Sequence, residues 1–294
     1  MTTLTQTTRL RLLQGSDLLL LGVALIWGTS YGVAKQALVF YPVLGFLAVR
    51  FCLTFLILLP QLRGAGRRAW APGLPLGGVL LAIFLAETYG VQLTTASNAA
   101  FLISLCVVLT PFVEWLLLGQ RPERRVLPAV ALSLLGTWLL SGGVNLAFNL
   151  GDGLMLLAAL LRALLVCLTR RLTAASEVPA LALTAVQTGV VGGGCLLLGF
   201  TLLPGGLPPL PQAPAFWIGS LYLVLFATLL AFYVQNHALR RSSPTRVALL
   251  MGSEPLFGAL FAVLWLSEQL SAQAWLGGLL IVAATLWTGL LRRQ

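Results

Sequence analysis

Long apolar runs, broken at intervals by Arg, Pro and Gly, fill this chain from Asp17 almost to its last residue. A helix that crosses a lipid bilayer needs about 20 mostly apolar residues, and these runs have that length. The sequence therefore predicts an all-α, polytopic membrane protein. Ten transmembrane helices are expected over residues 17–37, 42–59, 74–95, 98–119, 127–143, 152–172, 179–201, 214–238, 244–266 and 272–291.

Arginines occur in every second connection between these runs, and the intervening connections carry no Lys or Arg. The arginines are Arg9 and Arg11, Arg63, Arg67 and Arg68, Arg121, Arg124 and Arg125, Arg170 and Arg171, Arg240 and Arg241, and Arg292 and Arg293. Because Lys and Arg favour cytoplasmic loops, both termini and all of these connections are predicted to be cytoplasmic. The Pro-rich connection at residues 204–214 is predicted to lie outside.

Composition supports a bilayer as the solvent. Of 294 residues, 59% are hydrophobic and 9% charged, whereas soluble domains are about half apolar and a quarter charged. The net charge of +10 comes from small clusters between apolar runs, so no nucleic-acid partner is expected. The four cysteines lie in apolar runs without metal-ligand spacing, so neither disulfides, a metal nor another cofactor is expected.

The two halves of the chain resemble one another. Residues 17–35 align with residues 152–170, with an acid at the start and a base at the end of each, and residues 97–120 align without gaps with residues 245–268. This pattern predicts two repeats, residues 1–145 and 146–294. Since each repeat holds five helices, the second must be inverted in the membrane, which is an arrangement typical of transporters with a solute site near mid-membrane.

Short motifs along both repeats resemble the EamA-type branch of the drug/metabolite transporter superfamily. They are Trp27-Gly28-Thr29-Ser30, Val49-Arg50-Phe51, Glu254-Pro255-Leu256-Phe257, and the helix ends at residues 116–120 and 264–268. Gln120, where the family often has Glu, and the late position of Pro111 depart from the family pattern. They weaken residue-level inference for the fourth helix.

This resemblance implies a central cavity lined by helices 1–4 and 6–9, with helices 5 and 10 peripheral. Within the family the chain looks most like bacterial exporters of aromatic and other neutral amino acids. The expected function is therefore export of an amino acid or a similar amphipathic metabolite by alternating access, in the bacterial inner (plasma) membrane. The partners expected are this solute and membrane lipids. A multidrug or other metabolite carrier of the same superfamily is the alternative.

Four ionisable residues are predicted to lie well inside the membrane: Arg50, Arg162 and Glu254 near its middle and Glu87 toward its outer half. Such groups are costly in lipid unless they face a wet cavity or one another. A balanced set of charges suits a zwitterion, with arginine for its carboxylate and glutamate for its ammonium. Alternatively, an Arg–Glu pair joins helices, or Glu87 or Glu254 carries a coupling proton. Lys35 and Glu114, nearer helix ends, are expected to snorkel to the interface.

Aromatic and polar side chains complete the candidate site. Tyr222, Phe226 and Tyr233 recur at spacings that place them on one helix face with His237, and Trp27 stacks above Tyr31 on the first helix. Gln187 in the seventh helix, and Phe101 and Ser104 in the fourth, could contact the solute or hydrogen-bond a neighbouring helix. Aromatic stripes also serve packing or interfacial belts, and this alternative stays open here.

Two other function classes match parts of the sequence. The motif at residues 28–32, Gly-Thr-Ser-Tyr-Gly, matches a serine-hydrolase signature, with Ser30 and His237 as a dyad. Helix rise separates Ser30 from the membrane face at which His237 ends its helix by about 20 Å, so the two cannot share a proton and an enzyme is not expected. A channel is a second alternative, because a polar cavity would serve a channel as well as a carrier.

Overall fold

The computed structural model describes residues 15–63, 66–94, 96–121, 123–142, 149–175, 178–266 and 269–290. All regular secondary structure among these residues is helical. The first half contains α1 (Gly15–Ala37), α2 (Val43–Leu58), the short 3₁₀ helix η1 (Leu59–Leu62), α3 (Gly66–Leu93), α4 (Ala96–Ser104), α5 (Cys106–Leu118) and α6 (Val126–Leu140). The second half contains α7 (Leu150–Thr173), α8 (Ala180–Leu202), α9 (Pro214–Tyr222), the π-helix η2 (Leu223–Leu230), α10 (Ala231–Leu239), α11 (Pro244–Met251), α12 (Glu254–Leu266) and α13 (Ala272–Leu290).

Many of these helices are suited to a lipid environment, as the apolar runs predicted. Within the described residues, seven segments are long and apolar enough to cross a membrane: Ser16–Ala34, Val43–Leu62, Arg68–Leu93, Phe101–Leu118, Leu150–Thr173, Ala180–Leu202 and Pro214–Leu239. Val126–Leu140 and Ala272–Thr288 are shorter apolar helices. The all-helical, multi-pass membrane class is thus supported, while the count of ten spans stays a prediction.

Several helices differ from the expected continuous spans. α3 begins at Gly66 rather than at residue 74, and it continues through Pro72 and Pro75. The expected fourth helix breaks at Leu105 into α4 and α5. The expected ninth helix breaks at Gly252 and Ser253 into α11 and α12, and the eighth contains η2.

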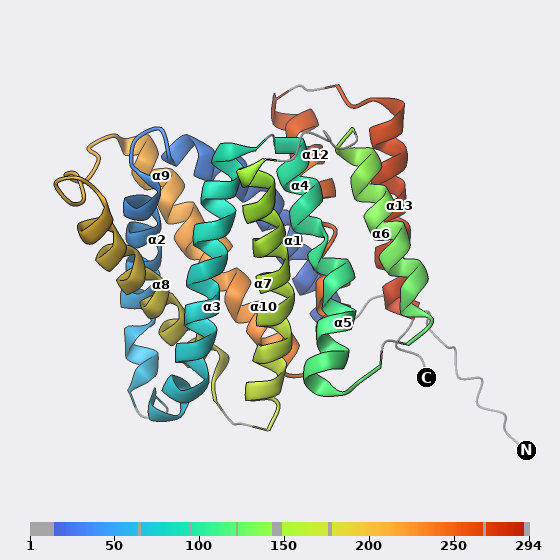
Figure 1. The fold of residues 1–294 in the computed structure, drawn as a ribbon, viewed down its shortest axis with the longest axis horizontal. Helices are drawn as coiled ribbons and strands as arrows, with labels where there is room; N and C mark the ends of the chain where they lie inside the picture. The colour runs from blue at the N-terminus through green and yellow to red at the C-terminus, as the bar shows by residue number, and fades with distance from the viewer. Residues whose placement is uncertain are drawn as a thin grey trace, which may run out of the picture.

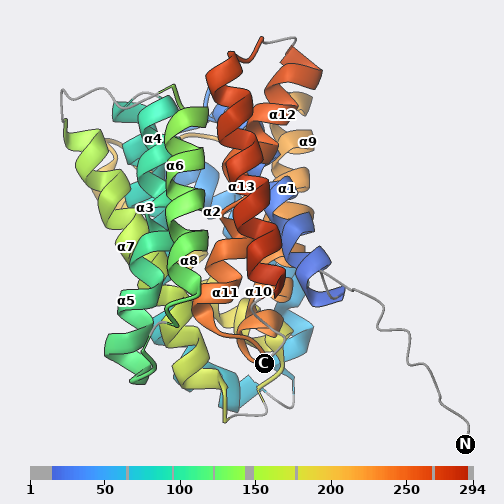
Figure 2. The same cartoon turned by 90° about the vertical axis from the view of Figure 1, so that its right-hand side faces the viewer.

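The helices run side by side, and the described chain begins and ends at the same end of the molecule, the lower end in Figures 1 and 2. We call this the arginine-rich end, because Arg63, Arg125, Arg170 and Arg240 lie at helix ends there. Contacts between distant segments agree with this arrangement. Arg246 at the start of α11 pairs with Asp17 in the first turn of α1 at 2.9 Å, and Trp287 near the end of α13 donates to the Arg125 carbonyl at 2.9 Å.

The opposite end holds the remaining described connections. Thr94, after α3, donates to Asp152 in the first turn of α7, where Asp152 also forms a capping box with Asn149. Tyr41, between α1 and α2, donates to the Pro208 carbonyl at 2.8 Å. Burial raises the pKa of Tyr41. The described connections at this end carry no Lys or Arg, so charge divides between the two ends as the sequence predicted.

Packing sorts the helices into two bundles and two linking pairs. α3, α4, α5 and α7 pack together, and we call them the first bundle. α1 packs on α9, η2, α10, α11 and α12, which together form the second bundle. α2 packs along α8 at one side of the bundles, where α8 also packs on α3, and α6 packs along α13 at the opposite side (Figure 1). Each bundle therefore combines helices from both halves of the chain.

Small residues let some of these helices approach backbone to backbone. Gly28 of α1 lies so close to α12 that a Cβ there would stand 2.7 Å from both the Glu254 carbonyl oxygen and the Gly258 nitrogen. A Cβ on Gly136 of α6 would stand 2.7 Å from the Gly277 carbonyl oxygen of α13. Such contacts hold membrane helices together where lipid supplies no hydrophobic force between them.

Candidate solute-binding cavity

A cavity of about 530 Å³ lies between the two bundles. Its described lining comes from α1, α2, α3, α4, α5, α7, α10, α11 and α12, together with Gly252 between α11 and α12 and residues just beyond α1 and α3, and includes no described residue of α6, α8 or α13. The polar and charged lining residues are Ser30, Arg50, Glu87, Thr88, Gln92, Thr94, Ser104, Thr110, Arg162, Gln235 and Glu254.

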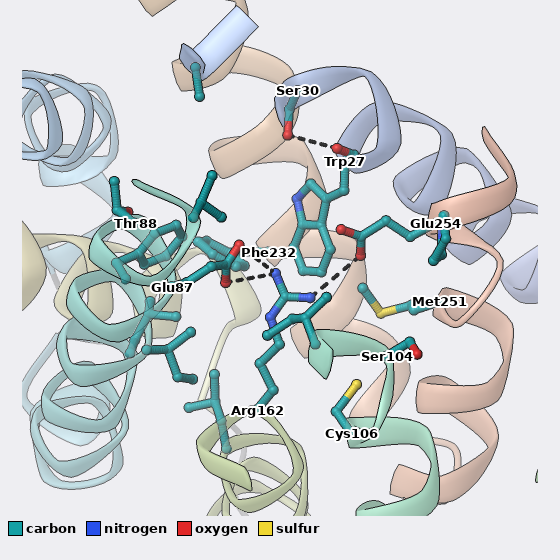
Figure 3. Close-up of a pocket in the computed structure, with 18 of the residues that line it drawn as sticks. Trp27, Ser30, Glu87, Thr88, Ser104, Cys106, Arg162, Phe232, Met251 and Glu254 are labelled. Atoms are coloured by element: carbon teal, nitrogen blue, oxygen red, sulfur yellow. Dashed lines mark hydrogen bonds and ion pairs between the residues drawn. The ribbon is translucent and has the colours of Figure 1, made fainter. Parts of the chain in front are cut away.

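Arg162 of α7 is the centre of the charged group (Figure 3). Its Nη2 lies 3.1 and 3.0 Å from the two carboxylate oxygens of Glu87 on α3, and its Nη1 lies 3.5 Å from Glu254 Oε2 on α12. The indole of Trp27 covers the guanidinium, with the ring centroid 5.4 Å from Cζ. Glu87 and Glu254 are both 7% exposed, so these charges interact in a partly desolvated site, where electrostatic forces are strong.

Arg50 of α2 reaches the cavity wall beside the π-helix. Its Nε donates to Thr228 Oγ1 at 2.7 Å and its Nη2 to the Ala227 carbonyl at 3.3 Å, and Trp27 Nε1 donates to the same carbonyl at 2.9 Å. In η2 the Ala231 amide donates to Phe226 O, five residues back, which presents the Ala227 carbonyl to these side chains. The π-helix thus orients Arg50 and Trp27 together.

Aromatic rings form one wall. The Arg50 guanidinium lies 5.3 Å from the ring centroids of both Phe51 and Phe84, which are favourable cation–π positions. Phe84 contacts Phe232 edge to face at 6.2 Å, and Phe232 contacts Trp27 at 5.8 Å. A flat apolar group placed here would meet aromatic edges and faces within reach of both arginines.

Two broken helices meet the cavity at equivalent places in the two halves. The break at Leu105 falls opposite Ser253 when residues 97–120 are aligned with 245–268, and Ser104, Cys106, Gly252 and Glu254 beside these breaks all line the cavity. Local bonds three residues apart, such as Leu105 N to Leu102 O and Ser253 N to Leu250 O, replace the helical pattern. Discontinuous helices in corresponding positions are typical of solute sites in transporters.

The cavity extends toward one end of the molecule only. Its lining includes Val39, beyond α1 and 81% exposed, and Thr94, beyond α3, both at the end opposite the arginines. Toward the arginine-rich end, α10 and α11 are held against the first bundle. Glu114 of α5 accepts bonds from the Thr245 amide, at 3.0 Å, and hydroxyl at the start of α11, and Arg170 of α7 donates to the Leu239 carbonyl, at 3.2 Å, and to the Arg240 carbonyl.

These contacts at the ends of α10 and α11 match charge to helix dipole, and we call them the helix-end clamp. A carboxylate is favourable at a helix N-terminus and a guanidinium at a C-terminus. The expectation that Glu114 snorkels to the interface is wrong: it is only 5% exposed, because the α11 N-terminus supplies its hydrogen-bond donors.

The structure brings part of the predicted site together at the cavity. Trp27, Arg50, Glu87, Ser104, Arg162 and Glu254 line it. Tyr31 is in α1, but the position of its side chain is outside the described structure. Ser30 and His237, the pair considered for a hydrolase, have other neighbours: Ser30 Oγ donates to the Trp27 carbonyl at 2.8 Å, and the His237 ring lies 6.0 Å from that of Tyr233.

The other candidates lie away from the cavity lining. Tyr222 shares a hydrogen bond of 2.7 Å with Thr29. Gln187 accepts from Asn236 at 2.9 Å between α8 and α10, and Phe101 is half-buried among α4 and α7. Phe226 and Tyr233 are 46% and 36% exposed on the outer surface of the second bundle.

Sequence reasoning missed several lining residues, among them Thr88, Cys106, Phe232, Gln235 and Met251. Gly252 and Pro255 are a signal that could have located the break before Glu254, and with it Met251, since glycine and proline interrupt helices. Gln235 is an uncharged polar residue in a mostly apolar span, which is a usable signal. Phe232 and Cys106 carried no signal, because apolar residues are equally common on the lipid-facing surface.

Comparisons with known proteins agree with this architecture. The sequence profile described as the EamA-like transporter family matches residues 14–142 and again residues 149–290. Two Archaeoglobus fulgidus proteins, each described as an uncharacterized transporter, are similar: one is 30% identical over 92% of this chain and 84% of its own length, the other 28% over 73% and 74%. A solved crystal structure of another protein has the same fold, with a TM-score of 0.79 and 18% identity over 95% of this chain and 97% of that one.

A multi-pass helical protein with a charged cavity between two bundles, and with transporters as relatives, is a membrane transport protein. Its profile matches extend over most of both halves, and the chain belongs to the EamA-like transporter family. A lipid environment and a small-molecule solute follow from this membership.

Proposed function

We propose that the protein exports amino acids, aromatic and other neutral ones, or similar amphipathic metabolites, across the bacterial inner (plasma) membrane. The observation that carries this proposal is the balanced set of charges in one cavity, with Arg50 and Arg162 opposed by Glu87 and Glu254. A zwitterion matches both signs. A strongly anionic solute would favour a cationic excess, and a strongly cationic one an anionic excess.

The aromatic wall supports an apolar or aromatic side chain on the solute. Trp27, Phe84 and Phe232 form a connected chain of edge-to-face contacts beside the charged group. A bound amino acid could place its polar end at Arg162 and its side chain against these rings. The same wall would suit the alternative, a multidrug or other metabolite carrier of the family, which is distinguished by its solutes.

We further propose alternating access by ten helices in two inverted repeats. Three observations support it: the family profile matches each half once, the broken helices occupy equivalent positions, and packing partners are exchanged between halves. α3 packs on α7 as η2 and α10 pack on α1, and α5 packs on α7 as α12 packs on α1. Such exchange is expected when a two-fold axis relates the halves.

The difference between the two ends of the cavity supports an assignment of the transporter's conformation. A lining that extends to Val39 and Thr94, with the helix-end clamp at the other end, fits an outward-open conformation if the arginine-rich end is cytoplasmic. The clamp would have to open for solute to enter from the cytoplasm.

A carrier of this kind saturates and catalyses counterflow of labelled solute in proteoliposomes, whereas linear, non-saturating flux would indicate a channel.

Neutralising the arginines tests recognition. Arg162→Gln or Arg50→Gln should reduce export of neutral amino acids much more than it reduces folded protein in the membrane, because each removes a cation that faces the solute. Arg171→Gln, on the exposed side of the last turn of α7, is the matched control. Export is measured in proteoliposomes and folded yield by size-exclusion chromatography.

The double variant Arg162→Gln/Glu87→Gln separates recognition from structural pairing, because Glu87 is the closest carboxylate to Arg162, at 3.0 Å. If the pair only joins helices, each single change leaves a buried unpaired charge that costs about 3–5 kcal/mol, and the double change restores both yield and export. If Arg162 recognises the solute, the double variant folds but does not export. Full export by the double variant would refute the recognition role.

A further inference from the structure

Arg162 is held by two carboxylates in unequal ways. Both oxygens of Glu87 lie within 3.1 Å of Nη2, whereas Glu254 contacts Nη1 at 3.5 Å, at the outer limit of a hydrogen bond. Glu87 and Arg162 both belong to the first bundle, and Glu254 belongs to the second. The Arg162–Glu254 contact is thus the weaker one, and it crosses the cavity between the bundles (Figure 3).

We propose that Glu254 is the exchangeable partner of Arg162 and determines which carboxylates the site accepts. The carboxylate of the solute takes the place of Glu254 on Nη1, and Glu254 then binds the ammonium group of the same solute. Glu87 stays on Nη2 and positions the guanidinium under Trp27. This inference rests on the proposed function, because it requires a solute with both groups.

The exchange conserves charge. Before it, Arg162 lies between the two carboxylates of Glu87 and Glu254; afterwards Arg162 and Glu254 each have a partner on the zwitterion, whose net charge is zero, so no proton is needed. A solute with a carboxylate but no ammonium would displace Glu254 from Arg162 without offering it a cation, which is costly in a partly desolvated cavity. Such a solute can bind only when Glu254 takes one proton from solution. Zwitterions therefore bind without a proton, and plain carboxylates bind with one.

The surroundings of Glu254 allow the proton uptake on binding a plain carboxylate to be detected from the pH dependence of the dissociation constant. α6 and α13 carry no titratable residue in their described spans. The titratable and charged residues that line the cavity with Glu254 are Arg50, Glu87, Cys106 and Arg162. Tyr31 and Lys35 also lie on α1, with their side chains outside the description. Effects of pH on these groups act on both kinds of solute, so a zwitterion serves as the internal control for a carboxylate of the same shape.

The first experiment uses the unaltered protein. Binding of phenylalanine and of 3-phenylpropionate is measured by isothermal titration between about pH 5.5 and 8, where phenylalanine keeps both charges and the propionate its single charge. The dissociation constant of phenylalanine should stay nearly constant. That of 3-phenylpropionate should rise about tenfold per pH unit in the range where Glu254 must be protonated, since one proton is taken up on binding.

The outcomes separate the inference from the function it rests on. Equal pH profiles for the two ligands would overturn the exchange and leave export of amino acids intact. Failure of phenylalanine and every other neutral amino acid to bind or be transported would overturn both. This measurement requires no variant, so it does not depend on the folding of a mutant.

The second experiment reverses the preference. Glu254→Gln keeps the shape of the side chain without its charge, and it should weaken phenylalanine about tenfold while strengthening 3-phenylpropionate and abolishing its pH dependence. Glu87→Gln is the matched comparison, because it loosens Arg162 and should weaken both ligands. Equal weakening of both ligands by Glu254→Gln, in protein that elutes as a single folded peak, would contradict the role given to Glu254.

Discussion

Gly28 lies where α1 crosses α12, and a methyl group there would meet the backbone rather than a side chain that can move aside. Gly28→Ala should therefore lower the melting temperature of the purified protein, since overpacking costs about 1–3 kcal/mol. Gly22, six residues earlier in the same helix, has nothing within 4 Å of the position that a methyl group would take. Gly22→Ala should leave the melting temperature unchanged or raise it, because alanine favours helix by about 0.5–1 kcal/mol. Equal melting temperatures for the two variants would contradict the close crossing.

Charge was the most informative property of single residues in this sequence. Arg50, Glu87, Arg162 and Glu254 were selected because ionisable groups are costly in lipid, and all four line the cavity. Aromatic periodicity was less informative, since it identifies a helix face without saying whether that face meets lipid or the interior. Phe226 lies within η2, where hydrogen bonds span five residues and the regular spacing assumed for the stripe does not hold.

At the scale of elements, the helix-end clamp should control access to the cavity from the arginine-rich end. Glu114→Gln removes the charge that faces the α11 N-terminus, an interaction worth about 0.3–2 kcal/mol, so opening should become roughly two- to thirtyfold more frequent. Cys106 lines the cavity and can report opening once the other three cysteines are replaced by alanine. Its labelling by an impermeant thiol reagent, added to vesicles that present the arginine-rich end, should accelerate by this factor.

The exposed Glu123 supplies a control at the same end, because Glu123→Gln changes charge without touching the clamp. In the Glu123→Gln variant, Cys106 should be labelled at the same rate as in the parent protein. If Glu114→Gln labels no faster than Glu123→Gln, the clamp does not close the cavity.

Helix interruptions were harder to predict than helices. Apolar runs located the elements because lipid requires long, internally hydrogen-bonded segments. The break at Gly252 and Ser253 had a local cause in Pro255, whereas the break at Leu105 lies in an apolar stretch without glycine or proline. It lies where α4 and α5 pack against α7, so it depends on contacts with a distant segment and not on local preference.

At the scale of the whole molecule, the division of charge predicts sidedness. A single cysteine at Pro209, in the connection between α8 and α9, should react with an impermeant reagent added to intact cells. A single cysteine at Glu123, between α5 and α6, should react only after permeabilisation. Cytoplasmic retention of positive loops is the physical reason. Labelling of both positions, or of neither, in intact cells would contradict the predicted ten-helix topology.

The first helix of each half, α1 or α7, packs with helices of the other half, and this has a consequence for biosynthesis. α1 leaves the ribosome well before its packing partners α9 to α12, which follow α1 by more than 170 residues. Until then Gly28 and its neighbours have no protein surface to pack on, so the nascent helix must wait in lipid or against the insertion machinery. Neither bundle can close while only the first half exists, which couples late translation to nearly all of the tertiary structure and makes assembly a long-range, slow process.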